Sequence, residues 1–73
     1  MSPSLPVLSG AELVLVLRKA GFAEVGQRGS HVKLRNAGGK TVIVPLHREL
    51  ARGTLSAILR QASMSIDDLV GLL

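Results

Sequence analysis

The sequence predicts an α+β fold in which helices cover one face of a three-stranded antiparallel sheet. Apolar residues repeat at helical spacing near both ends of the chain, they alternate with polar residues in the middle, and glycine-rich turns separate the alternating segments. The 73 residues suffice for one domain, which we expect to span residues 9–73 after an extended lead of residues 1–8. Because the chain has no cysteine, its core must come from aliphatic packing and not from disulfides or zinc–thiolate sites.

The first helix is expected to begin at Ser9. Ser9 and Glu12 have the spacing of a capping box, in which each side chain binds the backbone amide of the other residue. Gly21 suits the left-handed position that ends a helix, and Phe22 directly after it supplies the apolar contact typical of such an end. Between these ends lies an apolar stripe at helical spacing, formed by Leu13, Val16, Leu17 and Ala20.

Two more helices are predicted near the C-terminus. The first opens at Gly53 or Thr54, either of which can cap a helix. Its apolar stripe consists of Leu55, Ile58, Leu59 and Ala62. The second is short and begins at Ser65, with two aspartates in its first turn, where the helix dipole favours negative charge. Its stripe consists of Ile66, Leu69, Val70 and Leu73.

The middle of the chain changes to a period of two, which is typical of strands. A weak strand is predicted over residues 23–28 and a clear one over residues 30–35. A third strand is predicted over residues 40–44, and Pro45 ends it. Residues 36–39, with two glycines, supply the hairpin turn between the last two strands.

The clearest strand sorts its side chains onto two faces. Val32 and Leu34 point one way, so we expect the helices to cover that face, while His31, Lys33 and Arg35 point to the face left open to solvent. The element order becomes α-β-β-β-α with a short extra C-terminal helix. This is the sandwich arrangement of double-stranded-RNA-binding domains.

Positive charge concentrates in the middle and second half of the chain. The net charge is +4, and between residues 27 and 60 only Glu49 opposes the basic residues Arg28, Lys33, Arg35, Lys40, Arg48, Arg52 and Arg60. Such a segment suggests a polyanionic partner, a nucleic acid or an acidic protein, although a solvated basic surface explains the same charges. The longest apolar stretch is far too short to span a bilayer, and the N-terminus lacks the features of a signal peptide. We therefore expect a cytoplasmic protein that does not contact membranes.

The candidate catalytic residue is His31, which follows Gly29 and Ser30 at the start of the clearest strand. Cleavage of RNA without a metal needs a group that takes the proton of the 2′-hydroxyl and positive charge around the phosphorane. His31 can perform the first task. The basic residues around it can perform the second: Arg28, Lys33, Arg35 and Lys40. Together with Gly29 and Ser30, these four are the candidate RNA-binding residues. An exposed histidine on a strand can also lack a function, and the residues alone leave both interpretations open.

Secondary candidates lie after the third strand. His47 could be the complementary acid or base, or a loop residue without a chemical role. Arg52 and Thr54 lie at a helix start whose free amides can hold a phosphate, although capping alone explains Thr54 as well. The two histidines have no cysteine or carboxylate at metal-ligand spacing, and no glycine pattern for nucleotide binding is present. We therefore expect neither a metal nor another cofactor.

In order and spacing, these residues resemble the HicA family, also called YcfA-like. The similarity runs from about Ser9 to Leu73. It consists of Lys19–Phe22, Gly29–His31, the Gly-rich hairpin, Val44–Pro45 with His47, Glu49–Leu50, Gly53–Leu55 and Ile58–Ala62. The resemblance implies the double-stranded-RNA-binding-like fold and the activity of a ribosome-independent mRNA interferase, the toxin of a type II toxin–antitoxin module. It also implies that His31, in the Gly-Ser-His motif, is catalytic, that mRNA is the substrate, and that a HicB-type antitoxin covers the active face.

The chain departs from the commonest pattern of the family at two places. Many relatives have a histidine or an aromatic residue where this chain has Val32, which suggests that a stacking platform for an RNA base is missing. Ser63 and Met64 follow Ala62 in place of the usual glycine, which should affect only the bend between the last two helices. Two other functions stay open: a non-catalytic RNA-binding module, and an inactive antitoxin-binding subunit of the same fold.

Overall fold

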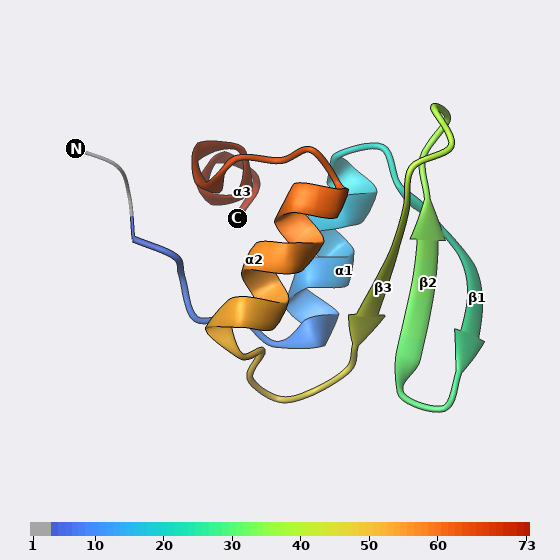
Figure 1. Ribbon diagram of the computed structural model, residues 1–73, viewed down its shortest axis with the longest axis horizontal. Coiled ribbons are helices and arrows are strands. Elements are labelled where there is room, and N and C mark those ends of the chain that lie inside the picture. Colours follow the sequence, from blue (N-terminus) through green and yellow to red (C-terminus); the bar gives the residue numbers. More distant parts are fainter. Residues whose placement is uncertain (1–3) are drawn as a thin grey trace.

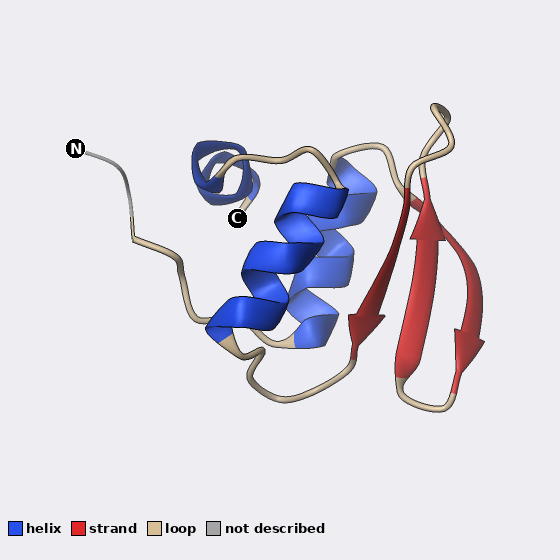
Figure 2. Cartoon of the chain, viewed as in Figure 1, coloured by secondary structure: helices blue, strands red, loops and turns tan. Residues whose placement is uncertain are grey.

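The computed structural model describes residues 4–73, and the helices and strands follow one another in the predicted order. They are α1 (Gly10–Lys19), β1 (Ala23–Arg28), β2 (His31–Arg35), β3 (Thr41–Pro45), α2 (Arg52–Gln61) and α3 (Ile66–Leu72) (Figure 1). The strands form one antiparallel sheet in the order β1-β2-β3, and the helices lie on one side of it (Figure 2). The predicted α+β sandwich with a short additional C-terminal helix is therefore confirmed.

The two predicted end signals of α1, the capping box at Ser9 and the glycine at position 21, are both present. The Ser9 hydroxyl accepts a hydrogen bond of 3.0 Å from the Glu12 amide, and the Glu12 carboxylate accepts one of 2.9 Å from the Ser9 amide. At the other end Gly21 has a φ of 97°, which a residue with a side chain adopts only with strain. The buried Phe22 then donates its amide to the Leu17 carbonyl oxygen at 2.9 Å. The capping box and the glycine end of this helix are confirmed.

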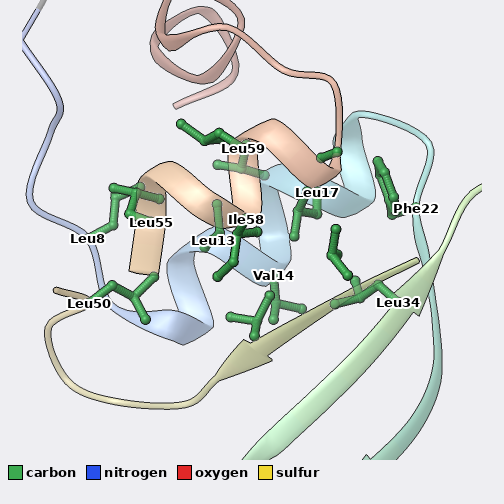
Figure 3. Packing of buried hydrophobic residues seen from close by; sticks show 14 of the residues in the cluster. Leu8, Leu13, Val14, Leu17, Phe22, Leu34, Leu50, Leu55, Ile58 and Leu59 are labelled. Atoms are coloured by element: carbon green, nitrogen blue, oxygen red, sulfur yellow. The ribbon is translucent and has the colours of Figure 1, made fainter. Parts of the chain in front are cut away.

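One apolar core, aliphatic except for Phe22, fills the space between the sheet and the helices (Figure 3). The sheet contributes the inward side chains of β2 and β3, which are Val32, Leu34, Val42 and Val44. α1 and α2 pack against them, and Leu13, Leu17 and Leu55 are almost completely buried. Burying an aliphatic side chain of this size stabilises the fold by about 1.5–3 kcal/mol. No polar or charged side chain is buried among residues 4–73, so the core depends on apolar packing alone.

The predicted lead of residues 1–8 falls partly on residues 1–3, which lie outside the described part of the chain. Its end is packed rather than loose. Leu8 is buried, and its carbonyl oxygen accepts a hydrogen bond of 2.8 Å from the Leu50 amide. This contact joins the segment before α1 to the segment before α2.

The start of α2 differs from the prediction. The helix begins at Arg52 with Ala51 as its N-cap, and no side chain caps it. The prediction of Gly53 or Thr54 as the cap is therefore wrong. The neighbouring Leu50 is buried in the core, so tertiary packing instead of a polar cap fixes where this helix begins.

The apolar stripes of α1 and α3 also differ from the predicted ones. Val14 is buried, whereas Ala20 is exposed because it is the C-cap, where the helix already ends. In α3 only Leu69 is fully buried, and Val70 and Leu73 are exposed. This helix has seven residues and meets the core at its margin, so it buries a narrower face than predicted.

The strands match the predicted segments to within one residue. β2 begins one residue later than predicted, at His31, and β3 is shifted by one residue because Pro45 still pairs with His31 in the ladder. Val32 and Leu34 are buried beneath the helices, as predicted. β1 is exposed along its whole length, and its register shifts at a bulge between Glu24 and Gly26.

The connection from β3 to α2 crosses the first turn of α1. The Gly10 amide donates a hydrogen bond of 2.9 Å to the His47 carbonyl oxygen, so the connection satisfies a helix amide that has no partner within the helix. A Cβ atom on Gly10 would lie 2.8 Å from Leu46 Cα and closer still to the Pro45 carbonyl oxygen. Only glycine leaves room for this crossing.

Gly10→Ala should lower the free energy of unfolding by about 2 kcal/mol or more, because the crossing backbone must move to admit the methyl group. Gly53→Ala in the first turn of α2 is the matched control, since a Cβ atom there meets nothing within 4 Å. That control should raise the free energy of unfolding by about 0.5 kcal/mol. Urea unfolding measures both variants, and a Gly10→Ala protein as stable as the parent would contradict the close crossing.

Two capping boxes link the stability of the fold to pH. Hydrogen bonds from the backbone amide and the hydroxyl of Ser9 hold the pKa of the Glu12 carboxyl below its ordinary value of 4.5. The same two groups of Ser65 hold the pKa of the Asp68 carboxyl below its ordinary value of 3.8. The unfolded chain therefore binds these protons at a higher pH than the folded protein does, and acid favours unfolding.

We expect the urea midpoint to fall as the pH drops through 4.5 and 3.8 and on through the lower pKa values of the folded state. Glu12→Gln keeps an acceptor for the Ser9 amide but cannot be protonated, so it should make this fall shallower. Asp68→Asn should do the same at the other box, and the double variant should show the shallowest fall. A double variant with the parental acid profile would mean that other carboxyl groups cause the effect.

Candidate functional site

The side of the sheet turned away from the helices is uncovered (Figure 1). Residues directly opposite one another in an antiparallel sheet point to the same face, so the register groups the residues of the open face into three rows. The rows, each given from β1 through β2 to β3, are Arg28, His31 and Pro45; Gly26, Lys33 and Ile43; and Ala23, Arg35 and Thr41. The three members from β2 are all exposed. Basic side chains thus occupy the middle strand of the open face.

A tight turn fixes the backbone directly before His31. Gly29 has a φ of 57°, and its carbonyl oxygen accepts a hydrogen bond of 3.0 Å from the side-chain amide of Gln27. The Ser30 carbonyl oxygen accepts one of 2.6 Å from the Leu46 amide, which joins the turn to the residue after β3. His31 therefore begins β2 on a fixed backbone with its side chain exposed.

An open depression of about 490 Å³ borders His31 on this face. Its lining residues are Gly26, Gln27, Arg28, His31, Lys33 and Ile43. None of them is acidic and two, Arg28 and Lys33, are basic, so the local field favours an anion. The volume lies in the range of sites that bind small molecules or parts of larger ones. The arrangement can hold a phosphodiester near an imidazole.

Arg35 and Lys40 do not line this depression. The Arg35 guanidinium donates a hydrogen bond of 3.2 Å to the Thr41 hydroxyl, and the Lys40 ammonium donates one to the Ser63 hydroxyl in the turn after α2. Arg35 ends β2, so it lies about 13 Å along the strand from His31. The structure thus places Arg28 and Lys33 beside His31 and the other two predicted basic residues at the far end of the sheet.

The secondary candidates also lie outside the depression. His47 is exposed in the connection after β3, two residues beyond the Pro45 that pairs with His31. Arg52 and Thr54 are exposed in the first turn of α2. The structure places His47 near the end of the sheet where His31 lies, and it leaves Arg52 and Thr54 in the helical layer.

Position 32 lies on the other face of the sheet. Val32 is 4% exposed and points into the core, so a ring at this position would not reach a ligand on the open face. The expectation that Val32 costs the protein a stacking platform is therefore wrong. Ser63 has a φ of 56°, a left-handed conformation that a glycine would adopt without strain.

Gly26, Gln27 and Ile43 are the residues of this site that sequence reasoning missed. Ile43 alternates with the buried Val42 and Val44, so the period of its strand already indicated an outward side chain. Gly26 carried a weaker signal, because a glycine inside a strand often marks a bulge or a close approach. The face that Gly26 occupies depends on the bulge after Glu24, and one strand's alternation does not reveal such a shift of register.

Residues 4–73 contain no group of three His, Cys, Asp or Glu side chains placed to hold a metal ion. Within the same residues, no helix has the length and apolar character needed to cross a membrane.

The chain matches a known protein family over most of its length. The model of the family described as HicA toxin of bacterial toxin-antitoxin matches residues 10–64, which run from the start of α1 to the turn after α2 and include the whole sheet. No curated protein matches the chain significantly. Because the family match covers more than half of the chain, the protein belongs to the HicA family, the toxins of bacterial toxin–antitoxin systems.

Proposed function

We propose that this protein is a ribosome-independent mRNA interferase, an endoribonuclease that cuts single-stranded mRNA without a metal and uses His31 as its catalytic residue. The observation that supports this proposal most strongly is the exposed His31 beside Arg28 and Lys33 at one open depression. Membership of a toxin family adds support, because His31 ends the Gly-Ser-His segment through which the chain resembles other HicA proteins.

The proposed reaction is a transfer of the phosphodiester to the neighbouring ribose hydroxyl. The neutral imidazole of His31 takes the proton of the 2′-hydroxyl, since an imidazole accepts and returns protons near neutral pH. The 2′ oxygen then forms a bond to phosphorus, and the bond from phosphorus to the 5′ oxygen breaks. The 5′ oxygen takes a proton from water or from a protonated side chain. The products are a 2′,3′-cyclic phosphate and a 5′-hydroxyl.

Arg28 and Lys33 have a separate role in this proposal. Negative charge grows on the non-bridging oxygens as the phosphorane forms, and fixed cations near those oxygens lower the barrier. Arg28 lies directly opposite His31 on β1, and Lys33 is the next outward residue along β2. The guanidinium can bind two phosphate oxygens at once, whereas the ammonium acts as a point charge.

A HicB-type antitoxin is the expected protein partner. It would neutralise the toxin by covering the open face of the sheet, where the absence of acidic lining residues suits an acidic partner surface. We place the activity in the cytoplasm, where mRNA is accessible.

His31→Ala should lower the rate of cleavage of single-stranded RNA at least about a hundredfold, the contribution of a general acid or base. The assay follows 5′-hydroxyl ends in excess chelator. His31 is exposed, so its replacement should change the free energy of unfolding by no more than about 0.5 kcal/mol. Arg60→Ala, on the exposed side of α2, is the control and should cut at the parental rate.

A His31→Ala protein that cuts as fast as the parent would remove His31 from the mechanism. A parent that binds RNA but yields no product would instead support the non-catalytic RNA-binding module. Growth arrest on expression of the parent, but not of His31→Ala, would separate an active toxin from a subunit that only binds antitoxin.

Arg28→Ala and Lys33→Ala should each weaken binding of single-stranded RNA, measured with His31→Ala as the background so that the RNA stays intact. Each lost phosphate contact should also reduce the slope of log affinity against log salt by about 0.7. Arg60→Ala removes the same charge from α2 and should leave the slope unchanged. If both Arg28→Ala and Lys33→Ala kept the parental salt dependence of affinity, the RNA phosphates would bind elsewhere on the molecule.

A further inference from the structure

The depression beside His31 has an uncharged centre between its basic residues. Lys33, in the middle of the row next to His31, lies opposite Gly26 on β1 and Ile43 on β3. Gly26 contributes no side chain, and a Cβ atom built there meets nothing within 4 Å, so the space above it is open. Ile43 is 51% exposed and faces the same side. Lys33 thus has the apolar side chain of Ile43 on one side and open space above Gly26 on the other.

Both residues suit a site that another group enters. A glycine inside a strand weakens it and often marks a close approach by another group. Ile43 leaves about half of its apolar surface in water in the free protein. An apolar, planar group that enters the depression would cover this surface and occupy the space above Gly26.

We propose that this part of the depression is a base subsite, in which one unpaired base next to the cleaved phosphate packs on Ile43 and over the backbone of Gly26. The proposal rests on the endoribonuclease function proposed above. Arg28 and Lys33 then hold the phosphates attached to that nucleotide, so the charges match its backbone and the apolar centre matches its base.

The dimensions of the sheet agree with this assignment. Successive outward residues of β2 lie about 7 Å apart, so the row of Gly26 and Ile43 is one such step from the row of His31. A base that reaches this row has left the stack of its neighbours. The subsite therefore accepts single-stranded RNA and rejects a duplex, in which every base remains stacked.

The test uses an RNA oligonucleotide that the parent cuts once, and copies in which either nucleotide at the cut keeps its ribose but lacks its base. Removal of one of these bases should lower kcat/KM of the parent about tenfold, mainly through KM. Gly26→Val, which fills the subsite, should lower kcat/KM for the intact RNA by a similar factor and abolish the difference between the two RNAs. Ile43→Thr should act in the same direction.

Ala23→Val is the matched control, since it adds the same kind of side chain to the outward side of β1 in the row of Arg35, outside the depression. It should retain parental kinetics. Gly26 lies outside the left-handed region, and valine favours strands, so Gly26→Val is expected to fold, which urea unfolding checks.

The kinetics overturn the base subsite if the parent cuts intact and base-free RNA equally well, or if Gly26→Val retains the parental kcat/KM. The same RNAs are also compared for binding to His31→Ala by fluorescence anisotropy. This comparison tests the subsite through binding alone, because equal affinity for intact and base-free RNA would rule the subsite out. Absence of cleavage by the parent in excess chelator counts against the endoribonuclease function instead.

Discussion

The two-residue period of β2 is the constraint on which the open face depends. Val32 and Leu34 are buried beneath the helices, so the backbone has to turn the residues between them outward. A shift of the strand by one residue would place Lys33 in an aliphatic core that contains no polar group to pair with it. The apolar residues that stabilise the domain therefore also hold His31 and Lys33 on the solvent side.

Pairing between strands adds the second constraint. β2 alone supplies His31 and Lys33, whereas Arg28, Gly26 and Ile43 reach them from neighbouring strands. The bulge in β1 is essential to this arrangement, since it sets which of its residues face outward. The candidate site is thus a property of the three-stranded register and not of one motif.

The difference between local motifs and the pairing of distant segments also explains which features could be predicted from the sequence. α1 begins and ends where local signals place it, because Ser9 binds Glu12 at one end and Gly21 adopts the left-handed conformation at the other. α2 begins earlier than its polar residues indicated, since the preceding Leu50 is held by the core and by the Leu8 carbonyl.

For the site, alternation placed His31 and Lys33 on the open face correctly. It could not show that Lys40 binds Ser63 across the molecule, because that contact joins segments far apart in the chain. It also could not reveal that Gly26 shares a row with Lys33, since the bulge that brings them together belongs to the pairing of two strands.

β1 contributes Arg28 and Gly26 to the open depression, yet it is exposed throughout and forms one edge of the sheet. Its attachment to the domain rests chiefly on the hydrogen bonds of one ladder, while β2 and β3 are anchored by buried side chains. Segments with little buried apolar surface open locally at a lower free energy than the core does. Transient detachment of this edge would withdraw the guanidinium from the imidazole and leave the rest of the domain folded. The free energy of local opening of β1, rather than the global free energy of unfolding, thereby sets the fraction of time in which Arg28 lies beside His31.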